Sequence, residues 1–178
     1  MKIKKTNIMD CYKLNFNKNR DNRGSFHRSF CKKILKKKKI NFDIKQCNIS
    51  VNRFKFTLRG FHYLKKPYKE NKIIIPIHGS TYNVIIDLRK KSKTYLKKYV
   101  TILSNNSEGL IIPTGCANAF LTLSENTIIQ YYMDNYYETI PKSNYLGIKF
   151  DDKFFNIKWP YKIKKISTQD KNYKPFNN

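Results

Sequence analysis

The chain has 178 residues, of which 37 are Lys or Arg and 12 are Asp or Glu, for a formal net charge of +25. This length suits one hydrophobic core, and no change of composition divides the sequence, so we expect a single domain over residues 1–178. No apolar run approaches the ~20 residues that span a bilayer, and no apolar signal segment follows Met1. We therefore expect a soluble protein that is neither membrane-bound nor secreted.

The positive charge is spread along the whole chain. Such a charge attracts nucleic acid, and it equally attracts a nucleotide diphosphate, so charge alone does not separate these two kinds of partner. The cysteines lie far apart and form no Cys-x-x-Cys pair; they are Cys11, Cys31, Cys47 and Cys116. This pattern favours reduced thiols in a cytoplasmic protein.

The first 20 residues alternate loosely between polar and apolar side chains. A turn-rich segment at residues 15–22 leads to Arg23-Gly24, and we expect the first strand after it, from Ser25 to Phe30. Residues 32–39 are rich in lysine. They predict a short helix or a loop with a solvated face.

Strand-length segments then follow one another at a spacing of roughly 8 to 12 residues. They are rich in Ile, Val, Phe and Tyr and are separated by turn residues. The expected strands are residues 42–50, 54–63, 72–78, 82–88, 98–103, 110–112, 119–123 and 127–133. Residues 78–81 (His-Gly-Ser-Thr) predict a hairpin turn, and Pro76 indicates an edge strand or a bulge. This pattern predicts an all-β sandwich or barrel.

Residues 57–63 (Thr-Leu-Arg-Gly-Phe-His-Tyr) place a histidine on one of these strands. Arg59 suits a bidentate contact with phosphate, and Gly60 indicates a bulge or a close approach by another group. Histidine has an unperturbed pKa of ~6.5, which suits a general base near neutral pH. A lone histidine among apolar residues is more often a core side chain, so this segment alone leaves both interpretations open.

Further short motifs recur in a fixed order between about residues 20 and 170. They are Asp21-x-Arg23-Gly24-x-Phe26, Gln46-x-Asn48-x-Ser50, Leu58-Arg59-Gly60-Phe61-His62-Tyr63, Lys72, Val84-Ile85-Ile86-Asp87-Leu88-Arg89, Ile112-Pro113-x-Gly115-x-Ala117-x-x-Phe120, Tyr131, Tyr136-Tyr137, Gly147-Ile148-x-x-Asp151-Asp152, Ile157-x-Trp159-Pro160 and Ser167-x-x-Asp170. In this order and spacing the sequence resembles the dTDP-4-dehydrorhamnose 3,5-epimerase family of the cupin superfamily. The resemblance implies a cupin double-stranded β-helix, or jelly roll, with short helical or irregular terminal segments.

The resemblance also implies an isomerase that needs no cofactor. It would invert carbons 3 and 5 of dTDP-4-dehydro-6-deoxyglucose to give dTDP-4-dehydrorhamnose, for the synthesis of a surface polysaccharide. His62 matches the family's base and Asp170 the carboxylate that holds it, while Lys72 matches the lysine that stabilises the enolate. Tyr131 matches the acid on the opposite face of the sugar. Tyr132 should point the other way, because strand residues alternate between faces.

Substrate-binding residues follow from the same motifs. The resemblance implies Arg23 and Arg59 at the diphosphate, Gln46 and Asn48 near the sugar nucleotide, and Tyr137 stacked on the base. It also implies a homodimer.

Three positions depart from the family pattern. Asn118 replaces a histidine that contacts the substrate in relatives, so it keeps hydrogen bonding but loses a titratable group. Tyr145 replaces a glutamate, and Arg28 replaces another glutamate found in many members. These changes spare the four expected catalytic residues, but they leave open which sugar is bound and whether one or two centres are inverted.

Two other kinds of function remain open. A relative with the same base could be a 3-epimerase alone or a keto isomerase, and a non-enzymatic basic cupin could bind nucleic acid, although nucleic acid is not the partner we expect. The histidines are His27, His62 and His78, without a His-x-His pair, so we expect no metal site. The sequence has neither a glycine-rich phosphate loop nor a Rossmann fingerprint, which favours a reaction without a cofactor.

Overall fold

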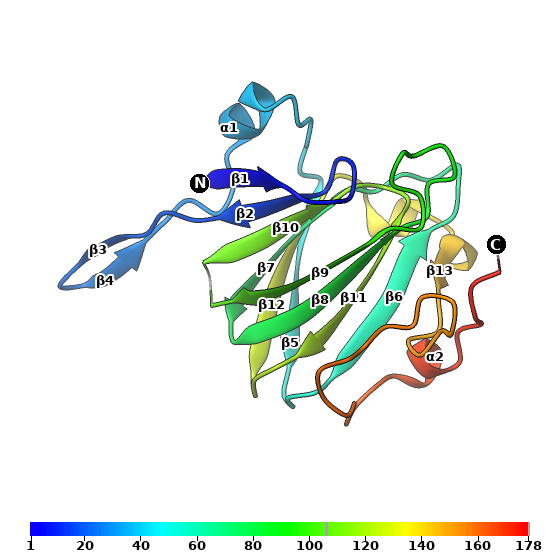
Figure 1. Cartoon of the computed structure of the whole chain (residues 1–178). Helices are drawn as coiled ribbons and strands as arrows, with labels where there is room; N and C mark the ends of the chain where they lie inside the picture. Colours follow the sequence, from blue (N-terminus) through cyan, green and yellow to red (C-terminus); the bar gives the residue numbers. More distant parts are fainter. Residues whose placement is uncertain (106, 178) are drawn as a thin grey trace.

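The computed structural model describes residues 1–105 and 107–177, and it folds them into two packed β-sheets of a jelly roll (Figure 1). The larger sheet holds, in spatial order, β1 (Lys2–Lys5), β2 (Tyr12–Asn15), β10 (Glu108–Ile112), β7 (Lys72–His78), β12 (Thr127–Met133) and β5 (Gln46–Asn52). The smaller sheet holds β13 (Tyr145–Gly147), β6 (Leu58–Leu64), β11 (Cys116–Thr122), β8 (Ser80–Asp87) and β9 (Lys98–Ser104). The predicted all-β jelly roll is confirmed.

The hydrophobic core lies between the sheets. Ile74 and Ile129 project into it from the larger sheet, and Ile85, Leu103 and Phe120 from the smaller one. All five side chains are at most 3% exposed. Burying each of them stabilises the fold by roughly 1.5–3 kcal/mol.

Parts of the outer faces of both sheets are covered as well. Ile73 and Ile75 of β7 pack against Leu35 of α1 (Lys32–Lys37), a short helix where the lysine-rich segment predicts one. On the smaller sheet, Phe61 packs beneath the C-terminal segment with Trp159. Strands that are buried on both faces read as continuous apolar runs, which is why the β7 sequence lacks alternation.

The strand predictions hold best in the middle of the chain, where β7 and β12 begin and end at the predicted residues. The expected strand from Ser25 to Phe30 is wrong. A hairpin of β3 (Asn19–Asp21) and β4 (Gly24–Phe26) occupies this region instead, because residues 22 and 23 close a tight turn between them. Figure 1 shows this hairpin standing away from the sheets.

Pro76 and Gly79 mark two irregularities at the end of β7. The register of the β7–β12 pair shifts next to Pro76, which confirms the predicted bulge, although β7 is a central strand. The hairpin predicted at residues 78–81 is wrong, since β7 pairs with β10 and β12 while β8 pairs with β9 and β11. The chain crosses between sheets at Gly79 (φ +77°), where a Cβ atom would lie 2.6 Å from the hydroxyls of Ser124 and Thr127.

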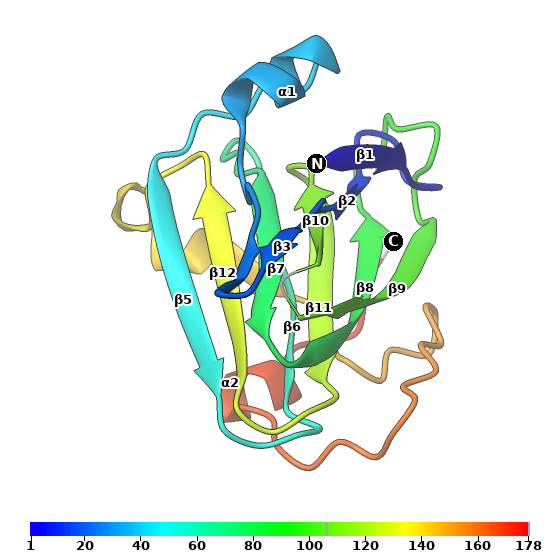
Figure 2. The same cartoon turned by 90° about the vertical axis from the view of Figure 1, so that its left-hand side faces the viewer.

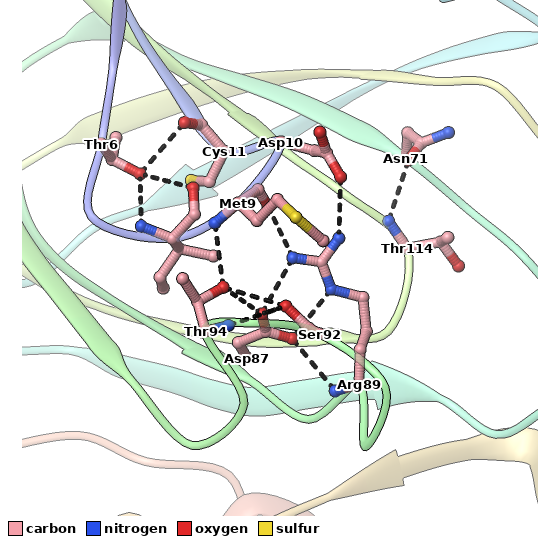
Figure 3. A network of polar contacts seen from close by, with 11 residues as sticks. Thr6, Met9, Asp10, Cys11, Asn71, Asp87, Arg89, Ser92, Thr94 and Thr114 are labelled. Carbon is pink, nitrogen blue, oxygen red and sulfur yellow. Dashed lines mark hydrogen bonds and ion pairs between the residues drawn. The ribbon is translucent and has the colours of Figure 1, made fainter.

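Asp87 and Arg89 tie the loop between β1 and β2 to the smaller sheet (Figure 3). The Arg89 guanidinium donates to both carboxylate oxygens of Asp87 at 2.8 and 2.9 Å, and to Asp10 of the loop at 3.2 Å. The hydroxyls of Ser92 and Thr94 also donate to Asp87. Burial acts to raise the pKa of Asp87, but these hydrogen bonds outweigh it and hold the pKa at about 2.

After β12 the chain forms two 3₁₀ turns, η1 (Tyr137–Thr139) and η2 (Lys142–Asn144), and later the one-turn helix α2 (Thr168–Lys171). Ser167 caps α2 by accepting a hydrogen bond from the backbone N–H of Asp170 at 3.0 Å. Figures 1 and 2 both place α2 beside β6. Within residues 1–105 and 107–177, every helix is too short or too polar to cross a membrane.

Candidate active site

A pocket of about 420 Å³ lies between β5, β7 and β12 of the larger sheet and β6 and β11 of the smaller one. The segment after β12 and the residues around α2 complete its wall. Among the residues predicted for the site, those that line it are Asn48, Arg59, His62, Lys72, Asn118, Tyr131 and Tyr137. The tertiary structure therefore brings together these seven side chains, which are spread over positions 48 to 137 of the sequence.

His62 lies on β6 at the pocket wall, and Asp170 holds it from behind. The Nε2 atom of His62 is 2.8 Å from Oδ1 of Asp170. The Asp170 side chain is only 6% exposed, whereas that of His62 is 44% exposed. The second carboxylate oxygen accepts the backbone N–H of Gly60 at 2.9 Å. Two hydrogen bonds and the capped helix thus fix the carboxylate behind the ring.

The electrostatics of Asp170 keep it ionised. Burial acts to raise its pKa, but the hydrogen bond and charge of His62, together with the Gly60 N–H, outweigh burial and hold the pKa below its ordinary value. An ionised carboxylate can only accept hydrogen bonds, so Nε2 of His62 carries the hydrogen. In the neutral ring, Nδ1 is then the nitrogen with the free lone pair that a base needs.

Gly60 allows the close approach of β6 and β11 beside His62. Its φ is +105°, and a Cβ atom there would lie 2.4 Å from the backbone oxygen of Asn118. The register of the β6–β11 pair shifts between Asn118 and Phe120. The prediction of a bulge or a close approach at Gly60 is confirmed, and both features are present.

Lys72 lies at the head of β7 and pairs with a residue that the sequence analysis did not identify. Its Nζ atom is 3.0 Å from Oε1 of Glu70, whose side chain is 1% exposed. The intervening Asn71 binds Asp134 and Thr114 through hydrogen bonds, which fix the backbone at this point. The pocket therefore contains an ammonium group beside a buried carboxylate. The only signal for Glu70 in the sequence is its position two residues before Lys72.

Tyr131 and Tyr132 point to opposite sides of β12, as strand alternation predicts. Tyr131 lines the pocket and packs against the core, while Tyr132 packs on the outer face and forms a 2.9 Å hydrogen bond with Ser29. Burial raises the pKa of Tyr131, although the Arg59 charge and the Ser50 hydroxyl oppose this effect. The phenol therefore stays protonated at neutral pH and can act as a proton donor.

Arg59 and Asn118 each have part of their hydrogen-bonding capacity in use. The Nε of Arg59 donates to the buried Asn52 at 2.8 Å, which orients an otherwise exposed guanidinium at the pocket. The Asn118 amide donates to the backbone oxygens of Val84 and Ala119. Asn118 is therefore held by its own sheet while it faces the pocket.

Gln46 and Tyr137 connect β5 to the segment after β12. The Gln46 amide oxygen accepts the backbone N–H of Tyr137 at 2.7 Å, and its nitrogen donates to Asn48 at 3.2 Å. Gln46 thus lies behind the lining residues and orients two of them. The ring of Tyr137 is tilted against that of Tyr145, with 4.7 Å between ring centroids.

Arg23 lies outside the pocket of its own chain. It is on the β3–β4 hairpin, where its side chain is 86% exposed and pairs with Asp21 at 2.7 Å. The structure of the single chain therefore does not bring Arg23 to the expected diphosphate position.

Several lining residues went unnoticed in the sequence because their motifs are weak. Gln169 and Tyr173 flank Asp170 and line the pocket. The Tyr173 ring meets the His62 ring edge-on, with centroids 6.0 Å apart, and it occupies the space where Gly147 lacks a Cβ atom. Across residues 1–105 and 107–177, no group of three or more His, Cys, Asp or Glu side chains could hold a metal ion.

Comparisons with known proteins identify a family for this chain. Residues 5–178 match the family model described as dTDP-4-dehydrorhamnose 3,5-epimerase. The dTDP-4-dehydrorhamnose 3,5-epimerase of Shigella flexneri is 33% identical over 163 residues, which are 88% of this chain and 85% of that protein.

Solved structures show the same similarity. The Bacillus anthracis dTDP-4-dehydrorhamnose 3,5-epimerase, with TDP and PPi bound, superposes with a TM-score of 0.92 at 34% identity, covering 98% of this chain and 99% of that one. The Legionella pneumophila dTDP-6-deoxy-D-glucose-3,5-epimerase, in complex with dTDP-4-keto-L-rhamnose, gives a TM-score of 0.89 at 28% identity over 98% and 92% of the two chains. The family match spans nearly the whole sequence and includes the strands that build the pocket, so this chain belongs to the dTDP-4-dehydrorhamnose 3,5-epimerase family.

Proposed function

We propose that the chain converts dTDP-4-dehydro-6-deoxyglucose into dTDP-4-dehydrorhamnose by inverting carbons 3 and 5. The observation that carries this proposal is the hydrogen bond between His62 and the buried Asp170 in the wall of a pocket that Lys72 and Tyr131 also line. These residues supply the base, the cation and the acid that the reaction needs.

The ketone at carbon 4 makes the hydrogens on carbons 3 and 5 acidic, because the resulting enolate places negative charge on the ketone oxygen. His62 removes the proton from one face, and the Lys72 ammonium stabilises the charged oxygen. Tyr131 then gives its proton to the opposite face and regains one from water, while His62 releases the proton it took to water before the second carbon reacts. Repeating these steps at the second carbon completes the reaction, which consists only of proton transfers.

Binding of the nucleotide falls to residues at the mouth of the pocket. Arg59 binds the diphosphate, because its guanidinium offers paired donors to phosphate oxygens. Tyr137 stacks on the base. Asn48 and Asn118 bind the sugar portion, and Gln46 supports Asn48 through the hydrogen bond between their amides.

The test is incubation of dTDP-4-dehydro-6-deoxyglucose with the protein in deuterium oxide, followed by NMR. We expect deuterium at carbons 3 and 5 and a product with both centres inverted. Deuterium at carbon 3 alone would instead identify a 3-epimerase, and absence of deuterium from both carbons would refute the proposal.

A homodimer would bring Arg23 to a diphosphate. The β3–β4 hairpin stands away from the sheets of its own chain (Figure 1), and it exposes Arg23 and Phe26, the latter by 72%. The edge strand β5 next to the pocket exposes Ile49 and Val51. In the proposed dimer, the hairpin of one chain reaches the pocket of its partner.

Mixing two inactive variants tests this arrangement. In a mixed dimer of Arg23→Ala and His62→Asn, one pocket combines an intact His62 with the intact Arg23 of the other chain. We expect activity to reappear when the variants are mixed after reversible dissociation. If the mixture stays as inactive as either variant, Arg23 does not act across the dimer.

We further propose that the enzyme works as a single domain over residues 1–178 in the cytoplasm, where it makes a deoxysugar precursor for a surface polysaccharide. All four cysteines are free thiols, which suits a reducing compartment. Both sheets contribute residues to one pocket, which supports a single functional unit.

A further inference from the structure

The carboxylate of Glu70 is buried in the pocket wall with unused hydrogen-bonding capacity. Its side chain is 1% exposed, and Oε1 lies 3.0 Å from the Lys72 ammonium. Neither oxygen accepts a hydrogen bond in the correct geometry from a residue that the structure describes. An ionised carboxylate has about four acceptor positions, so most of this capacity is open.

An ion pair alone explains this arrangement poorly. A buried ion pair is costly unless its remaining lone pairs accept hydrogen bonds. In proteins, the great majority of buried polar atoms have a hydrogen-bond partner. The backbone N–H of Glu70 donates to Thr114 at 3.2 Å, and hydrogen bonds with Asp134 and Thr114 anchor the next residue, Asn71, so the segment is held in place. A fixed acceptor of this kind in a ligand pocket indicates a donor on the ligand.

The position beside Lys72 identifies that donor. In the proposed function, on which this inference rests, Lys72 faces the ketone oxygen on carbon 4. Carbon 3 next to the ketone carries a hydroxyl, whereas carbon 5 carries a methyl group and the ring oxygen, which donate no hydrogen bond. We propose that Glu70 is a specificity-determining residue that accepts a hydrogen bond from the carbon 3 hydroxyl of the substrate.

The ammonium and carboxylate thus match two neighbouring oxygens of the sugar. Lys72 donates to the ketone, and Glu70 accepts from the adjacent hydroxyl. Hydrogen bonds to charged groups are stronger than neutral ones, and a site that loses its partner hydroxyl pays the cost of an unsatisfied buried acceptor. Such sites reject analogues without the hydroxyl much more strongly than apolar pockets reject a missing methylene.

The test compares the normal substrate with its 3-deoxy analogue. Deuterium exchange at carbon 5 is measured for both, because this position is the same in the two compounds. We expect the wild-type chain to exchange the analogue with a kcat/KM lower by roughly 10²-fold. In Glu70→Leu, which has no acceptor, the ratio of kcat/KM for the normal substrate to kcat/KM for the analogue should fall below about tenfold. Glu70→Gln keeps one acceptor, so its ratio should lie between those of the wild type and Glu70→Leu.

Glu125→Gln is the matched control, because Glu125 is an exposed carboxylate on the turn before β12 and should keep the wild-type ratio. Binding of dTDP, measured by calorimetry, shows whether each variant is folded. If Glu70→Leu does not fold, the discrimination measured with Glu70→Gln alone tests the inference. An unchanged ratio in the folded variants would overturn the inference, as would an equal loss of exchange on both compounds, which would mark Glu70 as a base or a structural residue.

The controls also separate this inference from the proposed function. If the wild-type chain exchanges neither carbon of the normal substrate, the proposed function fails and the role of Glu70 fails with it. If exchange is normal but discrimination does not depend on Glu70, only the inference about the carbon 3 hydroxyl is wrong.

Discussion

His62 and Asp170 are 108 residues apart in the sequence, yet one hydrogen bond of 2.8 Å joins them. The buried carboxylate settles which ring nitrogen carries the hydrogen, because an ionised carboxylate can only accept. The residue that orients His62 thus comes from near the C-terminus and does not itself line the pocket.

The first prediction concerns the base. His62→Asn keeps a polar side chain but removes the titratable nitrogen, so deuterium incorporation at carbons 3 and 5 should fall by roughly 10²- to 10⁴-fold or more. Binding of dTDP should persist, because the proposed nucleotide contacts come from other residues. Exchange in the folded variant at the wild-type rate would show that another group removes the proton.

The second prediction separates the acid from the base. Without the Tyr131 phenol, the enolate is reprotonated mainly from the His62 face, which restores the original configuration. Tyr131→Phe should therefore lower inversion by roughly 10²- to 10⁴-fold while exchange falls less.

Tyr132→Phe is the matched control for Tyr131→Phe, since Tyr132 packs on the opposite face of β12. It should retain most of the activity. The measured quantity is the ratio of deuterium incorporation to product formed in each folded variant. Loss of inversion in Tyr132→Phe, with activity kept in Tyr131→Phe, would reverse the assignment.

At the scale of elements, β6 positions the site through its contact with β11. The backbones approach closely at Gly60, whose N–H also binds Asp170. The same glycine therefore serves both the sheet contact and the carboxylate that holds His62, the proposed base.

The third prediction is that Gly60→Ala destabilises the protein by about 2–4 kcal/mol. The added Cβ atom would meet the Asn118 backbone, and φ of +105° is strained for alanine. Denaturant unfolding measures the loss. Gly24→Ala is the control, because Gly24 has a similar positive φ but no described atom within 4 Å of the added Cβ, so its loss should be clearly smaller. Equal losses would show that the contact with Asn118 is unimportant.

At the scale of the whole molecule, the ion pairs of Arg89 with Asp87 and Asp10 tie the N-terminal loop to the smaller sheet. The Asp87 carboxyl is 0% exposed, and its pKa lies at about 2 instead of 3.8 in the folded chain. The unfolded chain therefore binds more protons than the folded chain between these pH values. The resulting stabilisation is complete above pH 3.8 and is lost as the pH falls through 2.

The fourth prediction follows from that difference. Between about pH 4 and pH 2, the wild-type free energy of unfolding should fall by about 2 kcal/mol through Asp87. Asp87→Asn should lower stability at neutral pH and flatten this part of the pH profile. The exposed Asp151→Asn serves as a control and should leave the curve within about 0.5 kcal/mol of wild type. A profile that Asp87→Asn does not alter would contradict the role of this network.

The sequence predicts the local part of the fold well, because strand periodicity and turn residues are properties of neighbouring residues. The ends of β7 and β12, the bulge at Pro76 and the close approach at Gly60 all follow from local patterns. The order of the short motifs also identifies the family and the residues expected at its site.

The sequence does not show which of its distant strands pair with each other. The turn at residues 78–81 looks like a hairpin, but only the packing of two sheets decides that β7 and β8 belong to different ones. The sequences of β1 and β2 are weakly patterned; β2 is a strand because β10 offers it an edge, and β1 in turn pairs with β2.

For this protein, the sequence by itself determined the β-strand pattern, which depends on residue type and spacing, and its resemblance to the family indicated the catalytic candidates. Only the tertiary structure decided that Glu70 is buried beside Lys72, and that Arg23 lies outside its own pocket. The physical reason is that burial and electrostatic environment arise from segments far apart in the chain. Glu70 becomes a buried hydrogen-bond acceptor beside Lys72 only because the surrounding strands remove it from water.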